Sequence, residues 1–197
     1  MNSTLLDNPQ FITSLIPIIR DFFIYVDDNN IALYNEFSFQ HELGIYLRNT
    51  LIGYQVQFER NISFFTDAKN TIKKEIDISI FNADKSERYA IELKYPINGQ
   101  YPEQLYSFVK DIKFMEQLKA LAFRHTYCIS VVSDRAFYTG SNNRGIYKYF
   151  RELHKIHGRI YKPTGKGKNV DYIELDGEYP FTWEFLDGNR KFYCIEI

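Results

Sequence analysis

Two carboxylates and a lysine occur at a spacing that would bring them together on a β-hairpin. Asp77 and Glu92 each lie in an alternating apolar stretch, and the turn-forming residues 82–87 separate the two stretches. A turn centred on Asp84 and Lys85 would place Asp77 directly opposite Glu92, with Cβ atoms roughly 4.5–5.5 Å apart. The sequence therefore predicts two facing carboxylates on one side of a hairpin.

Two facing carboxylates can bind a metal cation that lies between them. Like charges directly opposite one another are destabilising unless neutralised, and carboxylate oxygens are preferred ligands of hard divalent cations. Lys94 follows Glu92 by two residues, so its ammonium lies on the same strand face, where it can orient a water molecule. A metal there would polarise a phosphate and lower the pKa of its bound water. These residues would suffice to cleave a phosphodiester, or else they form a salt-bridge cluster on an exposed strand face.

Periodicity predicts the elements that surround the hairpin. Apolar spacing indicates a helix over 35–52, a strand over 54–59, and a strand-like piece with a polar loop over 61–71. A long amphipathic helix over 102–122 and a buried strand over 125–132 follow the hairpin. The order is helix, three strands, helix, strand. Because the hairpin is antiparallel and the long helix can act as a crossover, we expect an α/β fold with a mixed sheet.

Alternation within the hairpin predicts its two faces. Ile76, Ile78 and Ile80 should point one way and Asp77 the other. On the second strand, Ile91 and its alternate neighbours should share the apolar face, opposite Glu92 and Lys94. We therefore expect one apolar side and one charged side.

The two ends of the chain are predicted to flank this core within a single domain. A helix should begin at Asp7–Pro9 and carry apolar residues from Phe11 to Val26, with a kink or break at Pro17. Towards the C-terminus, a helix is expected over 146–157, with short strands after it. These strands are placed at Ile160, 170–175 and 192–197. The expected divisions of the domain 1–197 are an N-terminal helical segment (1–34), a core (35–133) and a C-terminal α+β extension (134–197).

The hairpin and the order of elements resemble the PD-(D/E)xK nuclease superfamily. The matching residues are Glu75-Ile76-Asp77 on the first strand and Ile91-Glu92-Leu93-Lys94 on the second, although Ile76 replaces the proline of the family name. The helix before the sheet often supplies another acid in that family, for which Glu42 is the best match and Glu36 the alternative. Gln104 to Phe108 resembles the QxxxY element of recombination-type exonucleases, with Phe in place of Tyr. The resemblance spans residues 36–132.

The resemblance implies a restriction-endonuclease-like core and a magnesium-dependent nuclease, with manganese as a substitute metal. It implies Asp77, Glu92 and the Leu93 carbonyl as metal ligands, with Lys94 as the group that orients water. Glu42 would assist the metal, and Gln104 would position water or phosphate. The expected substrate is a nucleic acid, DNA first, in a restriction, defence or repair system, and a homodimer would suit cutting of both strands.

Charge is unevenly distributed although the net charge is only −1. Residues 144–168 contain eight basic residues and one acidic residue, whereas residues 169–197 contain seven acidic and two basic residues. The basic stretch would suit phosphate contact, or it is a solvated helix face and loop. The candidate nucleic-acid contacts are Arg144, Lys148, Arg151, Lys155, Lys166 and Lys168.

Composition is that of an ordinary globular protein, with 45% apolar and 25% charged residues. Cys128 and Cys194 are too few and too distant for a disulfide framework or zinc spacing, which favours a reducing, cytoplasmic compartment. We expect no signal peptide and no membrane span. Two other interpretations stay open. One is an inactive member of the same fold that binds nucleic acid or a partner, and the other is an immunity-type interaction protein with Tyr-rich contact surfaces.

Overall fold

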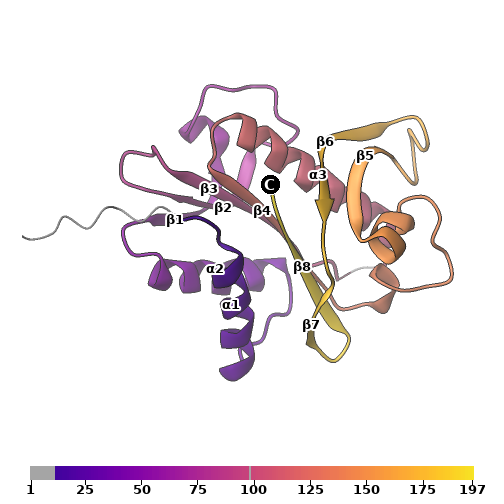
Figure 1. Cartoon of the computed structure of the whole chain (residues 1–197), viewed down its shortest axis with the longest axis horizontal. Coiled ribbons are helices and arrows are strands. Elements are labelled where there is room, and N and C mark those ends of the chain that lie inside the picture. The colour runs from indigo at the N-terminus through magenta and orange to yellow at the C-terminus, as the bar shows by residue number, and fades with distance from the viewer. Residues whose placement is uncertain (1–11, 98) are drawn as a thin grey trace, which may run out of the picture.

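A six-stranded mixed sheet lies at the centre of the protein, as seen in a computed structural model that describes residues 12–97 and 99–197. Helices α1 and α2 cover one face of this sheet, and α3 covers the other (Figure 1). The helix start predicted at Asp7–Pro9 lies outside the described residues, as does Phe11. The predicted α/β class and mixed sheet are confirmed.

The strand order is β1-β2-β3-β4-β8-β7. Among the strand pairs of the described residues, only β3–β4 is parallel, because α3 carries the chain from one strand to the next as a crossover. The other neighbours pair antiparallel. The bounds are β1 Gln55–Asn61, β2 Glu75–Phe81, β3 Arg88–Lys94, α3 Tyr101–Ala120, β4 His125–Val132, β7 Glu184–Asp187 and β8 Arg190–Glu196.

Two helices precede the sheet, and both begin where the local chemistry favours a start. Helix α1 (Ile16–Asp28) carries Pro17 in its first turn, where the missing N–H costs little, so the predicted kink or break at Pro17 is wrong. Helix α2 (Glu36–Thr50) is capped by Asn35, whose side chain accepts a hydrogen bond from Ser38 N at 2.7 Å. This cap fixes the start of α2, which places Glu36 in its first turn.

The sheet is buried on both faces, and each face has its own apolar core. The core beneath α1 and α2 contains Ile78, Ile80 and Ile91, whereas the core beneath α3 contains Ala90 and Ile76. Two expectations are therefore wrong. Ile76 does not share a face with Ile78 and Ile80, and Asp77 does not lie on the same side of the sheet as Glu92, which α3 covers.

The C-terminal third both extends the main sheet and forms a separate hairpin. Strand β8 pairs with β4, so residues after 133 complete the sheet of the core. Strands β5 (Lys155–Tyr161) and β6 (Tyr172–Pro180) form a two-stranded sheet beside α3, at the right of Figure 1.

Two sequence predictions for irregular regions fail. The helix expected over 146–157 is shorter: it covers 147–153, its last five residues, Tyr149–Leu153, are π-helical, and β5 begins at Lys155. The strand-like piece expected over 61–71 is a 3-10 turn, Ile62–Phe64, and a loop, and a further 3-10 turn covers Arg135–Phe137. Within the described ranges, no helix combines the length and apolar character that crossing a bilayer requires.

Candidate active site

The predicted hairpin register is confirmed, and it brings Asp77 and Glu92 together. Strands β2 and β3 pair from Phe81 with Arg88 to Ile78 with Ile91, which makes Asp77 and Glu92 the next opposed residues. At these two residues, hydrogen bonds between side chain and backbone replace the backbone–backbone hydrogen bonds of the ladder. The Asp77 N–H faces Glu92 Oε1 at 3.4 Å, and Leu93 N–H donates to Asp77 Oδ2 at 2.7 Å.

The sheet is also irregular on the other side of Asp77. Glu59 on β1 lies opposite Asp77 and has a φ of 48°, a left-handed conformation that is uncommon for a residue with a side chain. The side-chain amide of Gln40 donates to Glu59 Oε1 at 2.6 Å and to the Asp77 carbonyl at 2.8 Å. Side chains therefore bond the Asp77 backbone on both sides. Backbone irregularities of this kind cluster at functional sites.

A small cavity opens where the sheet is interrupted. It has a volume of about 200 Å³. The residues that line it are Glu36, Phe37, Gln40, Glu59, Asp77 and Leu93. Asp77 therefore reaches solvent from the α2 side of the sheet, while Glu92 lies beneath α3.

A buried ion network continues from the two carboxylates to α3. Glu92 and Asp111 are only 1% and 4% exposed. The Lys73 ammonium contacts the Glu92 carboxylate and lies 3.0 Å from Asp111 Oδ1. Lys94 Nζ lies 3.3 Å from Asp111 Oδ2 and donates to the Leu93 carbonyl at 2.8 Å. The alternative of an exposed salt-bridge cluster is therefore wrong, because Glu92 and Asp111 are buried. Burying such charges is costly unless they are paired.

Burial shifts the pKa of both facing carboxylates upwards. It raises the pKa of Asp77 to about 6, although the charges of Lys73 and Lys94 work against this rise. Burial also raises the pKa of Glu92 well above its usual range, and repulsion from Asp77 and Asp111 adds to the effect. A cation bound between Asp77 and Glu92 would favour their ionised forms and lower the pKa of both carboxylates.

The two ammonium groups are held in their charged forms. Burial lowers the pKa of Lys73 and of Lys94, but the combined attraction of the surrounding carboxylates, Asp111 foremost, outweighs burial and raises both values above the ordinary one. Lys94 is therefore a cation that donates hydrogen bonds, and it is not a base at neutral pH. It can orient a water molecule and stabilise negative charge, but it cannot take a proton.

The acid that α2 contributes to this region is Glu36. Its carboxylate accepts from Tyr95 N–H at 3.1 Å and lies 3.5 Å from Lys94 Nζ. Glu42, the sequence-based first choice, lies further along α2, does not line the cavity and forms none of these contacts. The periodicity of the helix explains the difference, because Glu42 follows Glu36 by six residues and therefore lies on another side of α2.

Sequence reasoning missed four residues of this site: Gln40, Glu59, Lys73 and Asp111. Asp111 did carry a signal, because it interrupts the apolar stripe of α3 three residues after Phe108. Lys73 lies in the loop before β2, where no local pattern distinguishes it. Phe108 itself packs in the apolar core against Phe137, so it takes no polar role.

Gln104 lies two helical turns before Asp111 on α3. Among the residues described, its side chain forms no hydrogen bond with the buried ion network. The structure thus brings Asp77, Glu92, Leu93 and Lys94 together, and it does not join Gln104 to them.

The basic stretch is partly neutralised by the acidic segment that follows it. Strands β5 and β6 pair the two segments, and Lys155 and Arg159 form ion pairs with Glu178 and Glu174. The Arg151 guanidinium donates hydrogen bonds to the backbone carbonyls of Ala136 and Asn142, so these contacts hold it against the protein's own backbone.

Four of the six predicted contact residues keep cationic side chains at the surface. They are Arg144, Lys148, Lys166 and Lys168. Arg144 and Lys168 line the same cavity.

The donor set around Asp77 suits a divalent cation in type and charge. Glu36, Glu92 and Asp111 pair with the two ammonium groups, and Asp77 lies within reach of their charges. Four carboxylates against two ammonium groups leave an excess of two negative charges when all are ionised. The buried Asp111 Oδ2 accepts no hydrogen bond. However, no three His, Cys, Asp or Glu side chains within 12–97 and 99–197 are already arranged to hold a metal. Binding would require the Lys73 ammonium to move away from Glu92.

Comparison of the chain with protein-family models, with curated proteins and with solved structures finds no match. Function must therefore be inferred from the geometry of these residues.

Proposed function

We propose that this protein is a magnesium-dependent nuclease of the PD-(D/E)xK type that hydrolyses phosphodiester bonds, most favourably those of DNA. The observation that carries this proposal is the interruption of the β2–β3 pairing at Asp77. There, Asp77 and Glu92 oppose each other on adjacent strands, and each carboxylate meets a backbone N–H of the opposite strand. Glu59, in a left-handed conformation, lies on the next strand, and the charged Lys94 follows Glu92 by two residues. Such an arrangement lowers stability, because it buries like charges that the fold itself does not need.

Each residue has a defined task in this proposal. Asp77, Glu92 and the Leu93 carbonyl would hold the metal, which supplies charge stabilisation and a more acidic water when bound. Lys94 orients the attacking water and stabilises the developing phosphate charge, as its raised pKa allows. Asp111 positions Lys94 through their contact at 3.3 Å.

Glu36 takes the place that Glu42 was expected to fill. Its contact with Lys94 keeps that ammonium near the cavity, and its carboxylate could assist the metal from the α2 side. Manganese is expected to replace magnesium, since both prefer oxygen ligands. A cytoplasmic role in restriction, defence or repair suits this chemistry, and cutting of both strands would suit a homodimer.

A second candidate function is an inactive protein of the same fold that binds nucleic acid without cutting it. The specific observation in its favour is the contact of the Lys73 ammonium with Glu92 and Asp111, which already supplies one positive charge to the carboxylates. A metal has to compete with this lysine. In the inactive protein the lysine is a permanent counter-ion.

Cleavage assays distinguish the two candidates. Linear and circular DNA, single- and double-stranded, would be incubated with magnesium or manganese and either the parent protein or Lys94→Ala. The proposal predicts metal-dependent cleavage by the parent and a loss of at least a hundredfold in the variant. Lys119→Ala, which removes an exposed lysine at the far end of α3, is the control and should cleave like the parent. No cleavage by folded parent protein under any condition would favour the inactive alternative.

A further inference from the structure

A second cavity lies away from the carboxylates, between the first turn of α3, the segment 142–149 and the β5–β6 hairpin. Its volume is about 610 Å³, which is within the range of ordinary ligand sites. We call it the tyrosine pocket. It is lined by Pro102, Asn142, Arg144, Gly145, Ile146, Tyr147, Tyr149, Arg159, Ile160, Tyr161, Pro163, Lys168 and Asn169.

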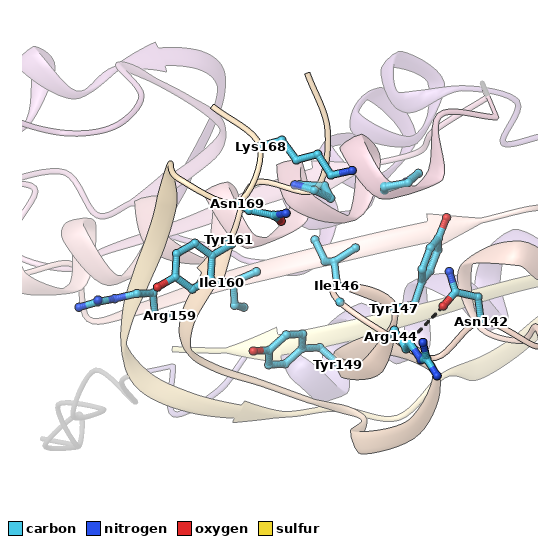
Figure 2. Close-up of a pocket in the computed structure, with 13 residues that line it drawn as sticks. Asn142, Arg144, Ile146, Tyr147, Tyr149, Arg159, Ile160, Tyr161, Lys168 and Asn169 are labelled. Carbon is cyan, nitrogen blue, oxygen red and sulfur yellow. Dashed lines mark hydrogen bonds between the residues drawn. The ribbon is translucent and has the colours of Figure 1, made fainter. Parts of the chain in front are cut away.

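The centre of the pocket is apolar and its edge is aromatic. Ile146 and Ile160 lie in the middle of the view in Figure 2, with Tyr147, Tyr149 and Tyr161 around them. Tyr161 is 46% exposed, so part of its ring is open to a ligand. Rings that keep an exposed face beside an apolar floor can stack on a flat, unsaturated ligand.

Two cations at the edge of the pocket are available to an anion. Within the described part of the chain, neither the Arg144 guanidinium nor the Lys168 ammonium forms an ion pair. The third cation differs, because Arg159 is paired with Glu174 and points away from the pocket in Figure 2. The pocket thus offers two free positive charges on side chains from separate loops.

Amide groups complete the lining. Asn169 extends towards the middle of the pocket in Figure 2, and Asn142 lies beside Arg144, whose N–H donates to Asn142 Oδ1 at 3.1 Å. Side-chain amides can both donate to and accept from the edge of a nucleobase. Aromatic rings, amides and unpaired cations together match one chemical class, a base joined through its sugar to a phosphate.

We propose that the tyrosine pocket binds one unpaired nucleotide, with its base against Tyr149 or Tyr161 and its phosphate near Arg144 and Lys168. A base paired within a duplex has both faces covered by its neighbours, so only an unpaired nucleotide can stack there. Since β3 ends at Lys94 and α3 begins at Tyr101, the pocket and the proposed active site are joined by a short segment. The inference rests on the proposed function, because it names single-stranded nucleic acid as the substrate class.

Binding measured without metal tests this pocket independently of cleavage. Fluorescence anisotropy in EDTA would compare a labelled single-stranded oligonucleotide with a blunt duplex of the same sequence. The parent should bind the single strand more tightly, and Tyr161→Ala should weaken binding about tenfold. Tyr161→Phe should keep most of the affinity because it keeps the ring. Lys119→Ala, about 25 Å along α3 from Pro102, is the charge-matched control and should bind like the parent.

Salt dependence separates the role of the ring from that of the cations. Lys168→Ala and Arg144→Ala should each reduce the slope of log affinity against log salt by about 0.7, whereas Tyr161→Ala should leave the slope unchanged. Competition with a mononucleotide tells whether a free nucleotide or only one within a strand fills the pocket, and displacement by either supports the assignment. Equal weakening by Lys119→Ala, or parent-like affinity in all pocket variants, would overturn it. Absence of cleavage would leave this result untouched.

Discussion

Replacing Asp77 by asparagine should stabilise the protein at alkaline pH, because the native state keeps this carboxylate at a cost. Burial raises the pKa of Asp77 from an ordinary value of 3.8 to about 6, so the folded protein holds this proton more tightly than the unfolded chain does. Stability must therefore fall as pH rises through this window. A difference of this size corresponds to about 3 kcal/mol, an upper bound because the cavity leaves Asp77 in partial contact with water.

Asparagine has the shape of the protonated carboxyl group and can still accept the hydrogen bond from Leu93 N–H. Urea unfolding of the parent and of Asp77→Asn should show a gain of about 1–3 kcal/mol for the variant at pH 8. The gain should shrink as pH falls and approach zero only below pH 4, where Asp77 becomes protonated in the unfolded chain as well as in the folded state. Asp84→Asn, in the exposed turn of the same hairpin, makes the same chemical change and should not stabilise. A variant less stable than the parent at pH 8 would refute the reasoning.

Two further predictions concern the contacts of α3 with β6 and of α2 with β1. Glu116→Ala should cost about 3 kcal/mol in urea unfolding, because the buried carboxylate accepts hydrogen bonds from the backbone of β6 and from the Tyr179 hydroxyl. Glu178→Ala, which removes an exposed ion pair of the same hairpin, should leave stability nearly unchanged. Gly44→Ala should lower the thermal midpoint despite a better helix former, because its Cβ would overlap the Phe58 ring, and the cost should be about 1 kcal/mol or more. An unchanged midpoint would mean that this ring moves aside freely.

Periodicity was enough to predict the order of the core elements and the hairpin register. The alternation of Ile78 and Ile80 and the turn chemistry near Asp84 are local properties, and they set the pairing of β2 with β3. The same local reasoning failed at Ile76, because the alternation changes face beside Asp77. Strict alternation assumes a regular strand, so it cannot predict that β2 changes face at Asp77.

The remaining site residues could not be found from local patterns because distant segments bring them in. Lys73 reaches Glu92 and Asp111 from a loop, and nothing in its neighbourhood distinguishes it from a solvated lysine. Glu36 is only the alternative to Glu42 in the sequence, and the choice depends on which side of α2 packs towards the end of β3. The charge blocks at 144–168 and 169–197 were visible, but their mutual pairing across β5 and β6 depended on the register of that hairpin.

Cleavage by Asp77→Asn tests the central claim most directly, because this variant is expected to be at least as stable as the parent. Both proteins would be incubated with magnesium and single- or double-stranded DNA at pH 8, and the products would be resolved by length. The account predicts cleavage by the parent and none by the folded variant. Equal cleavage by both proteins would contradict the assignment of Asp77 as the residue that holds the metal.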